Sequence, residues 1–158
     1  MGGSECSARG LELARRVGQL VAERGGIVVC GGRGGVMEAA ARGAKEAGGV
    51  TVGILPGASA EDANPFIDIP VVTELGNARN VVNVLTSQAV IAIEGGYGTL
   101  SEIALALRSG IPVVGLETWS IVPPGGGDAG LIEVRTPEEA VEAAFSRAGR
   151  GRRGPFLE

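Results

Sequence analysis

Histidine is absent from this 158-residue chain, which excludes several kinds of chemistry. Without histidine there is no Ser-His-Asp or Cys-His catalytic group, and the commonest side-chain metal ligand is missing. The two cysteines, Cys6 and Cys30, do not form a metal-ligand pattern and do not imply a disulfide framework. We therefore predict no metal site. Any catalysis has to depend on carboxylates, Arg, Lys, Tyr, backbone amides or a cofactor.

Aromatic residues are also scarce, at 3% of the chain, so the core has to be built mainly from Val, Ile, Leu and Ala. No apolar run approaches the roughly 20 residues needed to span a bilayer, and no signal peptide opens the chain. The net charge of −4 argues against bulk attraction to nucleic acid or to an anionic membrane. We expect a cytoplasmic protein that binds neither nucleic acid nor membranes.

What the chain does contain is an alternation of short apolar segments and amphipathic ones, separated by many of its 28 glycines. Helices are predicted at 8–24, 35–47, 77–88, 99–109 and from 136 onward, and strands at 27–30, 50–55, 67–73, 89–93, 112–116 and 131–134. Pro70 limits the third strand to an edge or an end. This order predicts one α/β domain over residues 1–148, with a mostly parallel sheet covered on both faces, and a flexible basic tail at 149–158.

Two glycine-rich segments each lead from an apolar strand into a helix. Residues 31–38 and 95–102 both read Gly-Gly-x-Gly-x-x-x-Glu when they are aligned without gaps. Glycine permits close backbone approach, and a helix start offers unpaired N–H groups and a partial positive charge to an anion. Because ligands bind at the carboxyl ends of parallel strands, the turns predict a site for a phosphate-bearing molecule. The alternative is that glycine only makes both turns tight.

Two arginines and one glutamate accompany these turns. Arg33 stands where a helix begins, and Arg79 falls in the first turn of the next helix if Asn77 caps it. Cations at helix starts are unfavourable by roughly 0.3–1 kcal/mol, and a bound phosphate reverses that sign. The alternative is that both side chains bend into solvent. Glu102 has two interpretations, since it could contact the substrate or only complete a capping box with Thr99.

At these residues the chain resembles the Lonely Guy-like (SLOG) superfamily, whose members were once labelled "lysine decarboxylase". Residues 94–102 resemble its signature Pro-Gly-Gly-x-Gly-Thr-x-x-Glu, and Arg79 matches an arginine of the preceding helix. The segments 31–35, with Met37, and 53–56 also fit. Within the superfamily the chain looks most like small bacterial proteins related to the molybdenum cofactor carrier, which residues 95–102 and 136–140 resemble. The resemblance implies a Rossmann-like three-layer sandwich and a homodimer or homotetramer.

The resemblance implies two possible functions. Lonely Guy enzymes hydrolyse the N-glycosidic bond of nucleoside 5′-monophosphates, and Arg79 and Glu102 match their catalytic pair. The carrier proteins instead bind molybdenum cofactor, a pterin phosphate, as cargo without turnover. Both functions need a cradle for the ligand and its phosphate, and the matching positions are Ser4, Gly31, Gly32, Arg33, Gly34, Gly35, Met37, Gly95, Gly96, Tyr97, Gly98 and Thr99.

The chain departs from this family in two places. Glu94 stands where the enzymes have proline, and a carboxylate there repels a phosphate unless it pairs with Arg79 or accepts sugar hydroxyls. The family also begins with an apolar strand before its Gly-Gly-Ser loop, whereas this chain starts at Met1-Gly2-Gly3-Ser4. We expect that first, central strand to be missing beside residues 27–30. We hypothesise that the recorded start lies downstream of the true one, or that the chain is a truncated product.

Overall fold

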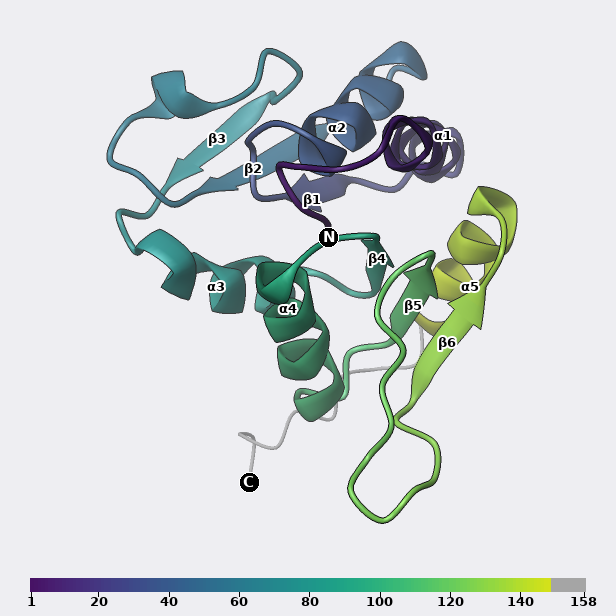
Figure 1. Cartoon of the computed structure of the whole chain (residues 1–158). Coiled ribbons are helices and arrows are strands. Elements are labelled where there is room, and N and C mark those ends of the chain that lie inside the picture. The colour runs from purple at the N-terminus through teal and green to yellow at the C-terminus, as the bar shows by residue number, and fades with distance from the viewer. Residues whose placement is uncertain (149–158) are drawn as a thin grey trace.

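Strands and helices alternate along the computed structural model, which describes residues 1–148 (Figure 1). The helices are α1 (Ala8–Glu23), α2 (Val36–Glu46), α3 (Arg79–Thr86), α4 (Tyr97–Arg108) and α5 (Pro137–Ala148), with short 3-10 helices at Ala60–Asp62 and Gly76–Ala78. The strands are β1 (Val28–Cys30), β2 (Thr51–Leu55), β3 (Ile69–Val72), β4 (Val90–Ile93), β5 (Val113–Leu116) and β6 (Leu131–Val134). The predicted α/β class is confirmed. The proposed tail at 149–158 lies outside the described residues, and the domain boundary stays a prediction.

All strand pairs are parallel, but the strands form two sheets of three instead of one continuous sheet. Their orders are β1-β2-β3 and β4-β5-β6. Pro70 lies in β3 opposite Gly53, on the outer strand of the first sheet. The prediction of an edge strand is confirmed there, because proline has no N–H for a second neighbour.

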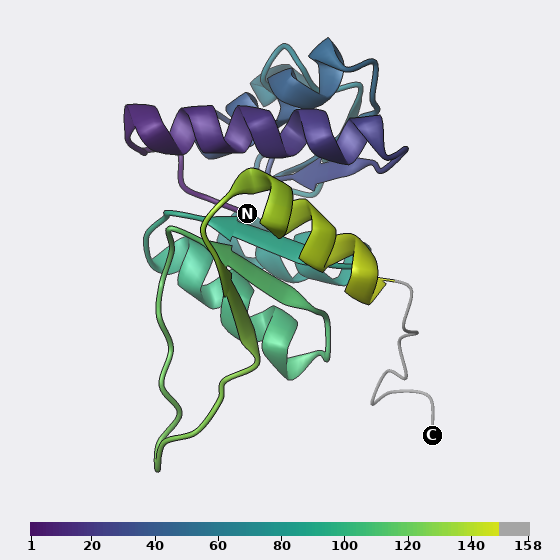
Figure 2. The same ribbon diagram turned by 90° about the vertical axis from the view of Figure 1, so that its right-hand side faces the viewer.

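The N-terminus lies between the two sheets in both views of the ribbon (Figures 1 and 2). The Met1 amine donates to the Ile91 carbonyl, and the Ile93 amide donates to the Met1 carbonyl at 2.9 Å. These two bonds have the pattern of a parallel ladder, so Met1 pairs with β4 as a neighbouring strand would. Within residues 1–148 no strand lies between β4 and β1. This is where the first, central strand of the family was expected to be missing.

The second sheet is packed on both faces. One cluster, on the side of α1 and α5, contains Leu13, Ala14, Val17, Val36, Ile93, Val114, Leu116, Ala140, Val141 and Ala144. The other, on the side of α3 and α4, contains Val84, Val90, Ala92, Ile103, Ala106, Ile111 and Val113. Neighbouring residues of β4 and β5 alternate between the clusters, since successive side chains of a strand point to opposite faces. No helix within residues 1–148 is both long enough and apolar enough to cross a membrane.

Glycine brings α1 and α2 into close contact, and α1 runs across the top of Figure 2. Gly18 of α1 lies against the Ala40 carbonyl of α2, and Gly43 of α2 lies against the Arg15 carbonyl of α1. A Cβ atom at either position would overlap the facing backbone oxygen. The pair of glycines therefore sets how closely these helices approach.

This contact predicts that Gly43→Ala destabilises the protein, although alanine is the better helix former by about 1 kcal/mol. Overlap with the facing helix should outweigh that gain, and we expect a net loss of about 1–3 kcal/mol in the free energy of unfolding. Urea denaturation measures it, with Glu12→Ala on an exposed face of α1 as control, which should change stability by less than about 0.5 kcal/mol. A stabilised Gly43→Ala variant would contradict the contact.

Candidate functional site

A cleft of about 760 Å³ lies beside the carboxyl ends of β1 and β4. Its walls come from the N-terminal segment, the first glycine turn, α3 and the start of α4. Ten of the predicted site residues line it, namely Ser4, Gly31, Arg33, Gly34, Met37, Arg79, Gly96, Gly98, Thr99 and Glu102. Gly32, Gly35, Gly95 and Tyr97 do not line it. Tertiary structure thus brings together segments that are up to a hundred residues apart.

Arg79 and Glu102 lie on neighbouring helices at the bottom of this cleft. The Arg79 Nη1 and Glu102 Oε1 atoms are 3.9 Å apart, and the two side chains are only 13% and 7% exposed. Asn83 of α3 donates from Nδ2 to the same Glu102 oxygen at 2.9 Å. A buried carboxylate needs such partners, because an unpaired charge is costly away from water. The two residues suggested as a catalytic pair are therefore adjacent.

The cleft carries a second cation besides Arg79. Arg33 is exposed and makes no ion pair with any residue between 1 and 148. Burial lowers the pKa of the Arg79 guanidinium, Glu102 opposes that effect, and the charge of Arg33 lowers it further. The Arg79 side chain stays protonated, since arginine keeps its proton in proteins. Two guanidinium groups thus face one cleft that holds a single buried carboxylate.

Gly31 explains how Arg79 reaches this position. A Cβ atom at Gly31 would collide with the Arg79 guanidinium, so only glycine lets that group lie against the first turn. Asn64 supports the same turn from the loop before β3, where it is buried. Its backbone N–H donates to the Gly32 carbonyl at 2.8 Å, and its Nδ2 donates to the Arg33 carbonyl at 2.9 Å. Asn64 was not among the predicted site residues, and the only signal for it in the sequence is the Asn64-Pro65 pair, which marks a turn.

The two turns differ in structure although their sequences repeat. Helix α4 begins at Tyr97, which matches Arg33 in the alignment, whereas α2 begins three residues later in the repeat, at Val36. Glu38 therefore falls in the first turn of α2 and does not line the cleft, while Glu102 falls inside α4 and does. The sequence pattern that the two turns share therefore does not give them the same structure. The capping-box interpretation of Glu102 is wrong, because α4 has already begun before Thr99.

The two turns differ in how far their helix starts are covered. The Val36 amide of α2 donates to the Gly3 carbonyl at 3.1 Å, and the N-terminal segment lies against Gly35. By contrast, no side chain caps α4, and no hydrogen bond from residues 1–148 occupies the amides of Tyr97, Gly98 and Thr99. First-turn amides have no partner within their own helix. The start of α4 thus has three first-turn amides without a partner among residues 1–148, and two of them, those of Gly98 and Thr99, belong to residues that line the cleft.

Residues 1–141 match the SLOG cluster4 family. The chain belongs to this family. Two solved structures have the same fold. The molybdenum cofactor binding protein of Rippkaea orientalis is 39% identical over 90% of each chain, with a TM-score of 0.81. The Moco carrier protein of Chlamydomonas reinhardtii is 36% identical over 96% of this chain and 94% of the other, with a TM-score of 0.81. A cytokinin riboside 5′-monophosphate phosphoribohydrolase of Mycobacterium tuberculosis is 36% identical over 69% of this chain and 63% of its own length.

Glu94 of this SLOG domain does not line the cleft. Its carboxylate accepts from the Ser7 amide at 3.0 Å and from the Ser7 hydroxyl, at the start of α1, and it also lies against Gly10. These bonds, chiefly from the Ser7 hydroxyl, lower the pKa of the Glu94 carboxyl. Glu94 therefore does not pair with Arg79, as it was expected to do if it were to avoid repelling a phosphate, and is bonded to Ser7 instead. A glutamate at this position serves the beginning of α1 instead.

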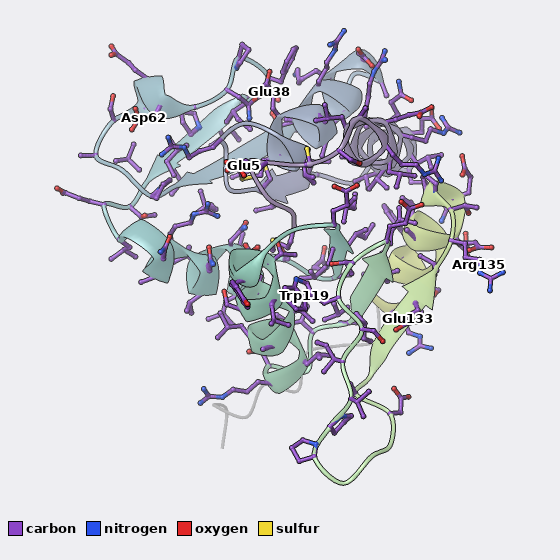
Figure 3. The ribbon with its side chains drawn as sticks, in the orientation of Figure 1. Glu5, Glu38, Asp62, Trp119, Glu133 and Arg135 are labelled. Carbon is purple, nitrogen blue, oxygen red and sulfur yellow. The ribbon has the colours of Figure 1, made fainter. Side chains whose placement is uncertain are left out.

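Tyr97 and Trp119 form a pair on the outside of the second turn, and Trp119 is seen beside α4 in Figure 3. The Trp119 indole donates to the Gly95 carbonyl at 3.0 Å, and its ring centroid lies 5.6 Å from that of Tyr97. Tyr97 is 82% exposed and lies outside the lining of the cleft. The Trp119 indole therefore binds the carbonyl side of this turn, while the amides of the turn, at the start of α4, stay free.

Three Asn residues of α3 and the turn before it were also missed, and Asn77, Asn80 and Asn83 all line the cleft. Asn77 does not cap the helix, because α3 begins at Arg79 after a 3-10 turn and has no side-chain cap. In the part of the chain that the structure describes, no group of three or more His, Cys, Asp or Glu side chains could hold a metal ion.

The bonds of Glu94 predict a pH effect on stability. A carboxyl whose pKa is lowered on folding stabilises the protein above its unfolded pKa, near 4.5, and that stabilisation is lost as the pH falls through the folded value. Glu94→Gln should therefore be less stable than wild type at pH 7, and the difference should shrink as the pH falls below about 4.5. Denaturant titrations at several pH values measure it. A difference that does not change with pH would contradict the role of the charge.

Proposed function

We propose that this chain binds a phosphorylated, pterin-like ligand of the molybdenum cofactor type in the cleft and carries it without turnover. The observation that carries the proposal is the convergence of Arg33, Arg79 and the free amides of Gly98 and Thr99 on one cleft. A helix start and two guanidinium groups suit a phosphate, since both favour negative charge. The similarity to carrier proteins over nine-tenths of the chain supports the choice of ligand class.

The size of the cleft fits this assignment. At about 760 Å³ it has room for a fused heterocycle as well as the phosphate, since small-molecule pockets run from roughly 300 to 1,000 Å³. The phosphate would lie at the start of α4, and Ser4, Gly31 and Met37 would contact the remainder of the ligand along the opposite wall. Molybdenum is part of the cargo in this proposal, and no metal ligand from the protein is needed.

A second candidate is hydrolysis of a nucleoside 5′-monophosphate, and the position of Glu102 favours it. A buried carboxylate beside Arg79 in a phosphate-binding cleft could polarise water or stabilise the cation-like sugar as the base leaves. The likeness to the mycobacterial phosphoribohydrolase supports this reading over two thirds of the chain. The two candidates share the phosphate cradle and differ in whether the bond to the heterocycle is broken.

Self-association as a homodimer or homotetramer also remains a proposal. Several apolar side chains of β3, the turn after it and α3 are exposed, among them Ile69, Val72, Leu75 and Val81. Large apolar side chains that gather on a surface often mark an interface. A cytoplasmic location is proposed with it, as the setting in which such a carrier would work.

The cradle predicts that Arg33→Ala weakens the binding of phosphate esters without changing the fold. Arg33 is exposed and makes no ion pair with the described residues, so its loss should leave the melting temperature unchanged and lower affinity about tenfold, the value of one charge-assisted hydrogen bond. Calorimetry with AMP and with a pterin phosphate measures it. Arg108→Ala at the far end of α4 is the matched control and should bind as wild type does. Equal affinities for all three proteins would contradict the cradle.

Turnover and cargo binding separate the two candidates. Purified protein is expected to retain a pterin phosphate, seen by mass spectrometry, to reconstitute a cofactor-free molybdoenzyme, and to release no base from AMP. Release of adenine that is abolished by Glu102→Gln would establish the hydrolase instead. Retention of neither kind of ligand, with no base release, would overturn both.

A further inference from the structure

Two polar atoms at the bottom of the cleft have no hydrogen-bond partner. They are Arg79 Nε and Asn83 Oδ1, both buried and both on α3. Asn83 is 1% exposed, and it lines the cleft together with Arg79 and Glu102. Buried polar atoms in proteins are nearly always paired, so an unpaired donor and an unpaired acceptor on the floor of a binding cleft require an explanation.

The orientation of the Asn83 amide is set by its neighbour. Its Nδ2 donates to Glu102 Oε1 at 2.9 Å and also contacts the Met1 sulfur at 3.1 Å. A carboxylate can only accept hydrogen bonds, so turning the amide over would place two oxygens against each other. The oxygen of Asn83 is therefore the atom that remains for a partner in the cleft.

The chemistry of the missing partner follows from these two atoms. Asn83 Oδ1 requires a donor, which a phosphate dianion or a carboxylate does not have. Arg79 Nε requires an acceptor, and residues four apart on a helix lie on the same face, so the two requirements fall side by side. A hydroxyl group satisfies both with one atom, and the edge of a heterocycle satisfies both with an N–H beside a carbonyl or ring nitrogen.

The position of this floor relates it to the phosphate cradle. Glu102, to which Asn83 is bonded, lies three residues after Thr99 on α4, a rise of about 4.5 Å along the helix. A ligand whose phosphate lies at the start of α4 would therefore place its next polar group near Asn83. That group belongs to the part of the ligand which the glycine turns and the arginines do not identify.

We propose that Asn83 accepts a hydrogen bond from a neutral O–H or N–H group in the non-phosphate half of the ligand, while Arg79 Nε donates to an acceptor beside it. Asn83 is then the residue that distinguishes a phosphate ester carrying such a group from phosphate itself. The inference rests on the proposed function, because it needs the phosphate at α4. It adds a specificity determinant that acts in either a carrier or a hydrolase.

The test compares wild type with Asn83→Leu, which has a similar size and no polar atoms. The probes are inorganic phosphate, ribose 5-phosphate, AMP and a pterin phosphate, measured by calorimetry. Asn83→Leu should lose about tenfold in affinity for the donor-bearing esters, the worth of one hydrogen bond, and should bind inorganic phosphate within about twofold of wild type. Unchanged phosphate binding also shows that the variant is folded. An effect on ribose 5-phosphate identifies a sugar hydroxyl, and an effect only on the ring-bearing ligands identifies a heterocyclic N–H.

Asn83→Asp is the second variant. Beside the Glu102 carboxylate an aspartate shares one proton with it, so one oxygen is held by Glu102 and the other still accepts. It should keep more of the preference for the esters over phosphate than Asn83→Leu does. If Asn83→Leu loses affinity equally for all probes, Asn83 only supports Arg79 and Glu102. If it loses affinity for none of them, Asn83 has no role in binding. Either result overturns the inference and leaves the proposed function standing. Wild-type protein that binds none of the esters overturns the proposed function and the inference together.

Discussion

A buried contact between opposite charges, Arg79 with Glu102, holds together the parts of the molecule that form the cleft. Neither charge is tolerated alone at this depth, because an uncompensated buried ion costs several kcal/mol. The 3.9 Å separation of the pair is longer than a direct hydrogen bond, so each group still has hydrogen-bonding capacity for a ligand. Helices α3 and α4 are held in register by this contact and by the Asn83 amide between them.

Other features of the site accommodate that pair. Gly31 has no side chain, and the Arg79 guanidinium occupies the space where one would be. The Met1 sulfur contacts the Asn83 amide. Burial lowers the pKa of the Met1 amine, although the charge of Glu102 opposes this effect. The cleft is thus bounded by a glycine turn on one side and by the start of the chain on the other, with the charged pair at its base.

The two glycine turns show how one sequence pattern serves two purposes. At α2 the turn is covered by the N-terminal segment, and its first helical amide is already bonded to Gly3. At α4 the turn is held from behind by Trp119 and leaves its amides free toward the cleft. Glu94 allows this, because it turns to Ser7 at the start of α1 and takes its negative charge away from those amides. A residue that looked unfavourable for phosphate is therefore bonded to the start of a different helix.

Much of the architecture was determined by the sequence alone. Apolar periodicity placed every strand and α-helix of residues 1–148 within about three residues, since buried strands and amphipathic helices have different periods. Pro70 predicted an edge strand, and the helix predicted from residue 136 onward begins at Pro137, where the Glu139 amide donates to the Thr136 hydroxyl at 3.2 Å. The glycine motifs, the placement of Arg79 and the family resemblance together predicted ten of the residues that line the cleft. These features are local, and local rules are sufficient to predict them.

Only the tertiary structure decided which neighbours each polar side chain meets. No spacing in the sequence places Glu94 at Ser7, which lies 87 residues away, or Asn64 under the first turn. The helix starts differ between the two turns because the N-terminal segment packs on one of them, and a repeat of letters cannot show that. In the sequence Asn83 is one polar residue on a short helix. Only the fold shows that its side-chain oxygen is buried and unpaired, on a helix that also carries Arg79. Periodicity depends on neighbours along the chain, whereas a site depends on contacts across it, and those contacts are made only when the chain folds.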